Sequence, residues 1–434
     1  MAKSKRRKGA TVSSARPTTM TQAVIARGNR RHSSPDGDQH QSHSSQRLGR
    51  PRFSHRRRLM LIVFLILAAP LAYRSYRVYT LRKLAWDASE ARQAGNWASL
   101  EAIAVRWGQA DRNTGMPWAL AAEAAEKRGS LSRAAAHLEH LPANDHRTPA
   151  ALMDLAKIYF GELNRPLQGV ATYRKALEMD PRFTEAHRRL IFYYGITVQR
   201  NEMVRQAREA IRLGCEPPEA YVYLIGADWL VFSNAYELNH KWLQSGEDNE
   251  TFEVAQIIHA LGARGHDDFE RSAKHERLLD EAVEKYPVNR ELLAYHLSKR
   301  ALRGDRDGVV ELLGRVPASA ADDSRFWHFK GWLDAANGEF EAAETAYREA
   351  LRRNPYAWQT QLELASVLRQ MGRFEEVEKY TAMSMRGKTL RRAILELPDV
   401  QSVPPTLFHE IQSYAQQCGD SEVATRLSRR LDQP

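Results

Sequence analysis

The sequence predicts an all-α protein, a stack of helical hairpins that follows a basic tail and one apolar segment. Apolar residues recur at helical spacing from residue 84 to residue 431. One stretch, Ser324–Pro355, carries the punctuation of a complete helix-turn-helix unit, and related stretches recur at intervals of about 34 residues. No alternation of strands and helices typical of a βαβ fold interrupts this pattern.

The order of residues within Ser324–Pro355 predicts two antiparallel helices. Trp327 and Gly331 are four residues apart and so share one face of the first helix. Gly338 is expected to end that helix, because glycine adopts a left-handed backbone at little cost. Pro355 lacks the amide N–H that a longer second helix would need, so we expect the unit to end there.

Side-chain size within the same unit predicts how its two helices pack. Gly331 and Ala343 have almost no side chain, which allows the helices to cross closely. Phe340, Tyr347 and Leu351 are expected to fill the space against the next hairpin. We therefore expect the unit to depend on its neighbours, because one hairpin of this kind cannot bury its apolar face alone.

The same frame recurs on both sides of this unit. Matching positions follow it from Gln361 and precede it from Trp118, Leu152 and His187, with weaker units elsewhere. These stretches resemble the tetratricopeptide repeat. The residues that carry the resemblance are Trp118, Tyr159, Tyr173, Pro181, Trp327, Gly331, Gly338, Ala343, Tyr347, Ala350, Pro355 and Gly372.

The resemblance implies a right-handed α-solenoid over residues 84–385. Residues 264–274 are expected to be a polar insertion in it. Residues 386–405 hold three prolines and are expected to form a linker. Residues 406–434 are expected to form a capping hairpin with a polar, Arg-rich outer face.

The front of the chain has a different composition. Residues 1–58 hold fifteen Lys and Arg against two acidic residues, a net charge of +13, whereas the whole chain carries +11. Residues 59–434 therefore carry about −2. We expect the tail to be disordered, because it has too few large apolar residues to bury. Its cations are expected to orient membrane insertion, with anionic lipid as a second target and nucleic acid as a third.

An apolar segment follows the tail. Residues 59–73 contain no charge, and Tyr73, Tyr76 and Tyr79 suit a membrane interface. This run is shorter than the roughly 20 residues that span a bilayer core, but the flanking arginines can snorkel. The sequence therefore predicts an uncleaved transmembrane signal-anchor helix at 59–79. A cleaved signal peptide and a buried core helix are the alternatives.

Charge asymmetry predicts the orientation of such an anchor. The tail is far more positive than the residues that follow the segment, so we expect a cytoplasmic N-terminus and repeats on the periplasmic or lumenal side. The two cysteines, Cys215 and Cys418, are not expected to meet, because hairpins of a solenoid contact only their neighbours.

Motifs for catalysis and metal binding are absent from the sequence. It contains no phosphate-binding glycine loop, no HExxH and no CxxC. The His and Asp residues between 262 and 275 fit no zinc spacing and are expected to lie in a solvated loop. We therefore expect no catalytic residue, no cofactor and no metal, and a protein that is not an enzyme.

The resemblance also implies a candidate binding surface. In this family the first helix of each hairpin lines the concave groove, and aromatic and Arg side chains are common interface anchors. The candidate partner-binding residues are Arg188, Phe192, Trp229, His328, Trp332 and Arg369. Packing between repeats is the alternative role for Phe192 and Trp332. The Lys and Asn set of the family's carboxylate clamp is missing, so we do not expect recognition of a chaperone C-terminus.

These inferences predict a membrane-anchored scaffold that binds a protein or peptide partner through the concave groove. One alternative is an accessory subunit of a cell-envelope or export enzyme complex. A second is a protein that tethers nucleic acid or anionic lipid through its basic tail.

Overall fold

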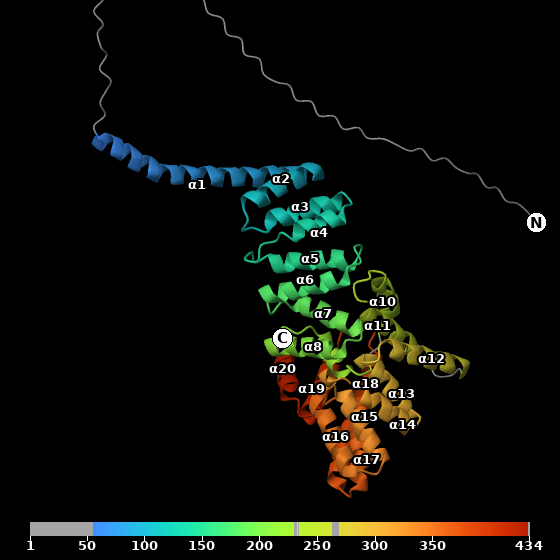
Figure 1. The fold of residues 1–434 in the computed structure, drawn as a ribbon. Coiled ribbons are helices and arrows are strands. Elements are labelled where there is room, and N and C mark those ends of the chain that lie inside the picture. The colour runs from blue at the N-terminus through green and yellow to red at the C-terminus, as the bar shows by residue number, and fades with distance from the viewer. Residues whose placement is uncertain (1–54, 230–231, 233, 263–268, 433–434) are drawn as a thin grey trace, which may run out of the picture. The chain divides into compact units, whose positions relative to one another are not determined.

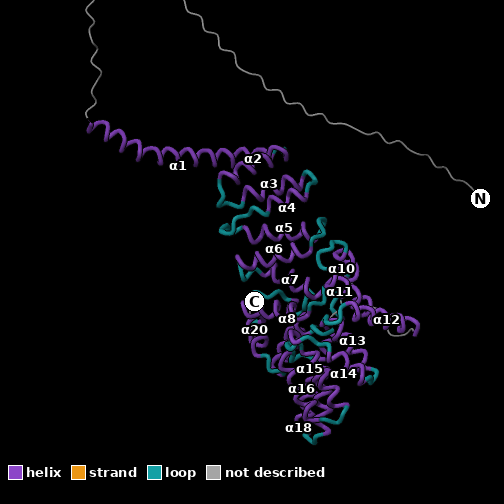
Figure 2. Tube along the Cα trace, in the orientation of Figure 1, coloured by secondary structure: helices purple, strands orange, loops and turns teal. Residues whose placement is uncertain are grey.

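The computed structural model of the chain describes residues 55–229, 232, 234–262 and 269–432. It divides into two units, residues 1–69 and residues 70–434. Helices, turns and loops account for all described residues, and no strand occurs among them (Figure 2). The basic tail expected at 1–58 lies outside the described residues as far as residue 54. Its last four residues belong to the first helix, so the tail ends earlier than expected.

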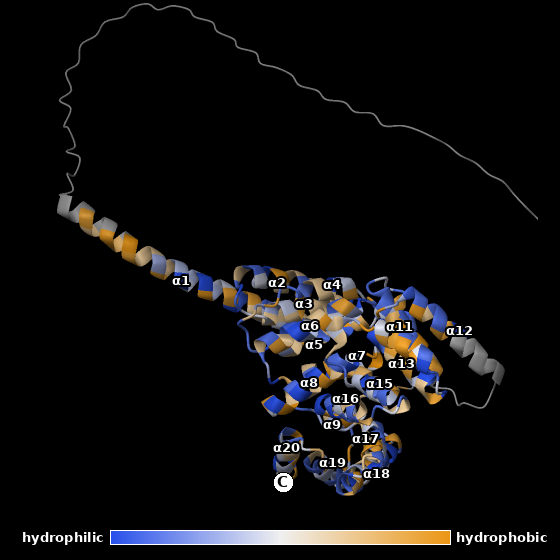
Figure 3. Cartoon of the chain, turned by 60° about the horizontal axis from the view of Figure 1, so that its bottom comes forward, coloured by the Kyte–Doolittle hydropathy of each residue, from blue (hydrophilic) through white to orange (hydrophobic). Residues whose placement is uncertain are grey.

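The first helix, α1 (His55–Gln93), contains the expected membrane anchor. Several of its apolar side chains are exposed, among them Leu59 and Phe64 at 67% each. Figure 3 shows this hydrophobic stretch along the first part of α1. Within the described residues, no helix combines the length and the apolar character needed to cross a bilayer. The expected anchor at 59–79 includes positions 61, 62 and 65, whose side chains lie outside the described residues.

The second unit continues from α1 with helices most of which pack against the next helix along the chain, while α20 lies beside α8 (Figure 1). The helices of its first part are α2 (Trp97–Ala110), α3 (Met116–Lys127), α4 (Leu131–Leu138), α5 (Thr148–Phe160), α6 (Pro166–Met179), α7 (Thr184–Ile196), α8 (Arg200–Leu213), α9 (Glu219–Ile225) and α10 (Ala235–Leu243). The helices of its second part are α11 (Asn249–Gly262), α12 (Phe269–Lys285), α13 (Arg290–Leu302), α14 (Arg306–Gly314), the short 3₁₀ helix η1 (Ala318–Ala320), α15 (Ser324–Ala336), α16 (Phe340–Arg353), α17 (Trp358–Gln370), α18 (Phe374–Leu395), α19 (Pro405–Gln417) and α20 (Ser421–Leu431).

The hairpin α15–α16 forms as the sequence predicts. Gly338 lies between the two helices with φ +83°, a left-handed backbone that favours glycine. Gly331 faces the ring of Tyr347, and a Cβ added to it would lie 2.8 Å from that ring. Tyr347 is fully buried as a result of this close crossing. The second helix ends at Arg353, two residues before Pro355.

The other residues that carry the repeat pattern occupy packed or turn positions. Trp327 donates its indole N–H to the carbonyl of Ala321 at 3.0 Å, and the guanidinium of Arg353 lies 4.8 Å from its ring centre. Gly372 has φ +75° in the turn after α17, and Pro181 is exposed just after α6. The buried members are Trp118, Tyr159, Tyr173, Ala343 and Ala350.

The C-terminal hairpin does not cap the array in the way that its polar sequence predicts. Its residues share one hydrophobic cluster with α7 and α9, in which Tyr221 meets Phe408 edge to face at 5.9 Å between ring centres. Arg426 of α20 donates to both carboxylate oxygens of the buried Glu216, at 3.0 and 2.9 Å. Arg426 and Arg430 of α20 therefore make an internal contact with the middle of the array, because a buried carboxylate there requires a cation, whereas Arg429 is exposed.

A second long-range contact holds the start of the same helix. Asp420, the N-cap residue of α20, accepts hydrogen bonds from Arg208 of α8 at 2.8 Å and from the Tyr356 hydroxyl at 2.7 Å. The hairpin α19–α20 thus contacts helices more than 200 residues earlier in the chain, as well as its sequence neighbours. The assumption that hairpins contact only their neighbours is wrong for this segment. Both cysteines are nevertheless free thiols.

Two expected boundaries also need correction. The linker expected at 386–405 is helical as far as Leu395, because Leu390 and Ile394 are buried and the next helix breaker is Pro398. Only residues 396–404 connect α18 to α19. Of the polar insertion expected at 264–274, positions up to 268 lie outside the described residues, and the remainder forms the beginning of α12 rather than a loop.

Candidate partner-binding groove

A groove runs along the first helices of successive hairpins in the second half of the array. Its walls come mainly from α13, α15 and α17, with further residues from α8, α11 and the turn after α9. Its volume is about 570 Å³. This value lies within the roughly 300–1,000 Å³ that is usual for binding pockets.

A network of ion pairs forms one side of the groove. Arg325, at the start of α15, donates two hydrogen bonds to Glu291 at 2.6 and 2.8 Å and two to Asp323 at 2.9 and 2.6 Å. Arg200, at the start of α8, lies 3.3 Å from Glu291 and donates to the carbonyl of Ala227. The network joins α8, α13 and α15, so it fixes the helices that line the groove.

Burial and pairing shift the pKa values of these groups in opposite directions. Burial alone would lower the pKa of Arg325, but Asp323 and Glu291 raise it well above its ordinary value. Burial would raise the pKa of Asp323, but Arg325 holds it below its usual range. Burial lowers the pKa of Arg200, which Glu291 partly opposes. Both guanidinium groups are thus occupied by carboxylates of the protein itself.

Glu363 of α17 lines the same groove and has no partner among the described residues. It is partly buried, and this burial raises the pKa of its carboxyl. Asp228, another carboxylate of the groove, differs because it accepts a hydrogen bond from Asn354 at 2.6 Å. A desolvated acid without a partner in a groove is a candidate for ligand binding.

Aromatic side chains make up much of the remaining wall. Trp332 and Tyr295 are partly buried against the hydrophobic cluster of α11–α15, and each presents the rest of its ring to the groove. Trp229 packs against the neighbouring cluster, and the guanidinium of Arg391 lies 5.4 Å from its ring centre. Leu302, at the end of α13, is 80% exposed and also lines the groove. Such a wall can bind apolar and cationic groups.

Three of the six candidate residues come together in this groove, namely Trp229, His328 and Trp332. The position of Trp229 differs from the expected one, because α9 ends at Ile225 and the tryptophan lies in the following turn. His328 is partly buried, its Nδ1 lies 3.0 Å from the Thr360 hydroxyl, and burial lowers its pKa to about 4.

The other three candidates do not line this groove. Arg188 binds Glu185 at 2.7 Å and Glu219 at 2.6 Å, so it joins α7 to α9. Phe192 packs edge to face on Phe232, with 6.0 Å between ring centres. Arg369 is exposed near the end of α17.

Sequence reasoning missed several residues of the groove. Tyr295 and Glu363 lie on first helices of their hairpins, one or two positions from those that the family frame nominates, so the frame could have found them. The repeat frame could not have indicated Arg200 and Asp228, because these residues reach the groove from distant segments of the chain. Among the described residues, no group of three or more His, Cys, Asp or Glu side chains is arranged to hold a metal ion. The His and Asp residues expected in a loop at 262–275 lie partly outside the described residues.

Comparison with known proteins identifies the repeat. A family model described as tetratricopeptide repeat matches residues 149–183 and 324–356. The chain therefore contains tetratricopeptide repeats at these two places. The two matched ranges fall on the hairpins α5–α6 and α15–α16. No curated protein matches the repeat protein in sequence.

Several solved structures match this chain at low identity and low TM-score. A tetratricopeptide repeat protein from Parabacteroides merdae is 13% identical, covers 67% of this chain and 99% of its own, and has a TM-score of 0.26. Human IFIT1 in its dimer with m7Gppp-AAAA is 14% identical, with 79% and 74% covered and a TM-score of 0.29. The APC/C hetero-tetramer Cut9–Hcn1 gives 12% identity, coverages of 81% and 72%, and a TM-score of 0.31. Similarities this low carry no information on what the repeat protein binds.

Proposed function

We propose that this repeat protein is a scaffold that binds a peptide segment of a partner protein in the groove of α13, α15 and α17. Tetratricopeptide repeats form helical scaffolds suited to protein interaction, and the groove is lined by first helices of successive hairpins. The observation that carries the proposal is Glu363, which has no partner among the described residues and lines one groove together with Trp332 and Tyr295. The bound segment therefore carries a Lys or Arg side chain next to an apolar residue.

The charges of the groove support a cationic ligand. Its arginines, Arg200 and Arg325, are held by Glu291 and Asp323. Glu363 is partly desolvated, and no cation of the described residues compensates its charge. A cation of the ligand would provide that compensation. The Trp332 ring of the same groove would bind this cation through its face and the apolar stem of the side chain through dispersion, whereas Lys299 already lies 5.2 Å from the centre of the Tyr295 ring.

Selection from a random peptide library displayed on phage tests this proposal. We expect the full-length chain to enrich peptides with a basic residue flanked by apolar ones. Trp332→Ala should weaken binding of a selected peptide at least tenfold, a loss of about 1.4 kcal/mol or more that is usual for a buried aromatic anchor. Glu363→Gln should remove the preference for the basic residue while keeping binding to the apolar part.

A matched control separates a local effect from a change of net charge. Glu378→Gln makes the same chemical change on the exposed face of α18, away from the groove, and should leave the selection unchanged. Enrichment of acidic peptides, or the same basic preference in Glu363→Gln as in the wild type, would contradict the proposed ligand.

We further propose that the scaffold is tethered to a membrane through residues 59–79 of α1, with the repeats on the exported side. Leu59, Phe64 and Leu71 are among the apolar side chains exposed along this stretch, and contiguous exposed apolar surface marks contact with lipid or another protein. The excess of Lys and Arg in residues 1–58 supports a cytoplasmic N-terminus.

Membrane fractionation and protease accessibility test the tether. We expect the full-length chain to resist extraction by alkaline carbonate, and the repeats to be digested in intact spheroplasts without lysis. A chain that carbonate releases would disprove membrane integration. Repeats that become accessible only after lysis would disprove the orientation and leave the tether in place.

A further inference from the structure

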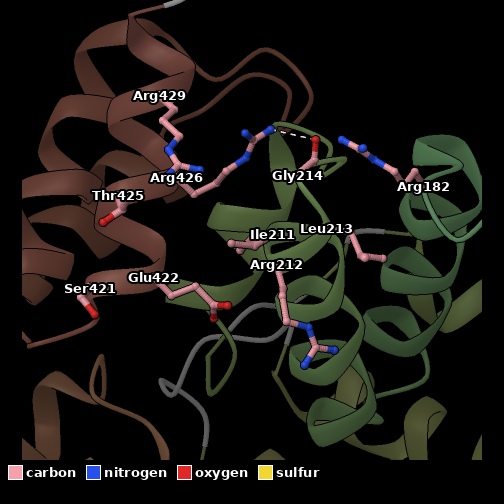
Figure 4. A pocket seen from close by; sticks show the side chains of 10 residues that line it. All are labelled: Arg182, Ile211, Arg212, Leu213, Gly214, Ser421, Glu422, Thr425, Arg426 and Arg429. Atoms are coloured by element: carbon pink, nitrogen blue, oxygen red, sulfur yellow. Dashed lines mark hydrogen bonds between the residues drawn. The ribbon is translucent and has the colours of Figure 1, made fainter.

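A second pocket shares no lining residue with the groove of α13, α15 and α17. It is formed by the end of α8, the face of α20 and the connection between α6 and α7, and its volume is about 460 Å³. Figure 4 shows the ten side chains that line it. Four of them are arginines and one, Glu422, is a carboxylate. The pocket exists only because α20 packs against α8.

Arg426 is held in a fixed position at this pocket. Its Nε donates to both oxygens of the buried Glu216, at 3.0 and 2.9 Å, and its Nη2 donates to the carbonyl of Gly214 at 2.8 Å. Its Nη1 has no partner among the described residues. Gly214 has φ +70°, which favours glycine, and a Cβ added there would lie 3.3 Å from the guanidinium carbon of Arg426. The group is thus oriented before any ligand arrives, which lowers the entropy lost on binding.

Two further arginines extend the positive surface. Arg182 and Arg429 have no side-chain ion pair or hydrogen bond among the described residues. In Figure 4 the side chains of Arg182 and Arg426 extend toward the Gly214 turn from opposite sides, and Arg429 lies one turn along α20 from Arg426. The fourth arginine, Arg212, extends away from these and pairs with Glu209.

We propose that this pocket binds the tetrahedral oxyanion of a small phosphorylated molecule. Arg182 and Arg429 can each donate paired N–H bonds that match phosphate oxygens, and Arg426 can add its Nη1, so the three together suit a dianion. The volume suits a small organic phosphate rather than a folded partner. The hydroxyls of Ser421 and Thr425 on the same wall can bind its polar remainder.

The position of the pocket gives binding a structural consequence. The ligand would contact Arg426 and Arg429 of α20 on one side and Arg182 of the α6–α7 connection on the other. It would therefore hold the C-terminal hairpin against the middle of the array. The ligand can contact both sides of the pocket only while α20 packs against α8. Its binding should therefore stabilise the contact between α20 and α8 by mass action.

Isothermal titration calorimetry of the full-length chain tests this proposal at constant ionic strength. The probes are inorganic phosphate, glucose 6-phosphate and glucose. We expect binding of one or both phosphates and none of glucose. Tighter binding of glucose 6-phosphate than of phosphate identifies an organic phosphate as the ligand class, and equal affinity identifies the free ion. Failure of both phosphates to bind overturns the proposal.

Paired variants show whether the arginines of the pocket are responsible. The double variant Arg182→Gln and Arg429→Gln should raise the Kd at least tenfold without loss of helicity, because neither side chain has an ion-pair or hydrogen-bond partner in the described part of the chain. The control is Arg147→Gln with Arg106→Gln, which removes the same charge from one turn residue and one exposed helical residue. The backbone N–H of Arg147 binds the carboxylate two residues earlier, as that of Arg182 does. Equal weakening in both double variants would also overturn the proposal.

Discussion

The hairpins α15–α16 and α19–α20 are both pairs of packed helices, but different interactions hold them in place. The first relies on shape, because Gly331 lets the ring of Tyr347 lie against the backbone of the facing helix. The second relies on two carboxylates, Glu216 and Asp420, that pair across more than 200 residues of sequence. Its amphipathic helices would suit a solvent-facing cap, but the pairing of Glu216 and Asp420 and the shared hydrophobic cluster hold α20 against the middle of the array. Local packing can be recognised in a single repeat, whereas long-range ion pairing cannot.

The largest expected effect concerns the carboxylate of the C-terminal contact. Glu216→Ala leaves Arg426 and Arg430 without their buried partner, and such a loss costs about 3–5 kcal/mol. We expect α20 to lose hydrogen-exchange protection while α15–α16 keeps it. The control, Glu349→Ala, removes a partly exposed ion-pair partner of Arg352 and Arg353 and should cost much less, because solvent screens such pairs. Equal loss in the two variants would mean that the contact is no stronger than a surface pair.

The next effect is a pH dependence in the repeat. Burial lowers the pKa of His328 to about 4 from 6.5, so the folded state keeps this ring neutral. As pH falls below 6.5 the unfolded state binds the proton first, and stability decreases until about pH 4 by up to about 3 kcal/mol. His328→Gln should flatten urea-unfolding stability over this window relative to the wild type. The exposed His409→Gln of α19 serves as control, and an unchanged slope in His328→Gln would refute the assignment.

A pair of tyrosine hydroxyls compares the two regions directly. Tyr221 donates to Glu216 at 2.9 Å, whereas the buried hydroxyl of Tyr347 has no partner among the described residues. Removing a hydrogen bond to a charged group costs about 1.5–3 kcal/mol, so Tyr221→Phe should lower the free energy of unfolding by that amount. Tyr347→Phe should change it by less than about 0.5 kcal/mol, or stabilise the fold slightly. Chemical denaturation measures both, and a larger loss for Tyr347→Phe would reverse the comparison.

The smallest effect concerns two helical glycines. A Cβ at Gly331 would lie 2.8 Å from the Tyr347 ring, whereas one at Gly314 would meet nothing within 4 Å. Crowding costs about 1–3 kcal/mol and alanine regains about 1 kcal/mol of helix propensity. Gly331→Ala should therefore destabilise by about 1 kcal/mol in thermal unfolding, and Gly314→Ala should stabilise by up to about that amount. The same sign in both variants would show that the close crossing has no energetic weight.

The sequence predicts local features well where a feature depends on neighbouring residues. The turn at Gly338 and the close approach at Gly331 follow from residues within one hairpin. The end of α16 before Pro355 follows from the chemistry of proline. The boundary of α18 is less predictable, because burial of Ile394 keeps the chain helical beyond the point where the repeat pattern ends.

The candidate groove is predictable only in part. His328 and Trp332 follow from the repeat frame, because both lie on the inner face of a first helix. Arg188 fits the same frame equally well, but Glu219 from the next hairpin pairs with it. The frame describes which face a residue occupies and cannot say which distant charge meets it there.

By itself, the sequence determined the all-α class, the hairpin unit and the charge difference between the tail and the array, since these depend on composition and on spacing within about 34 residues. Only the tertiary structure decided that Arg200 and Arg325 share Glu291, that Glu363 has no partner among the described residues, and that α20 packs on α8. Ion pairs between remote segments leave no periodic trace in a sequence. Which charges pair depends on which segments of the chain fold side by side and on the free-energy cost of burying an unpaired charge.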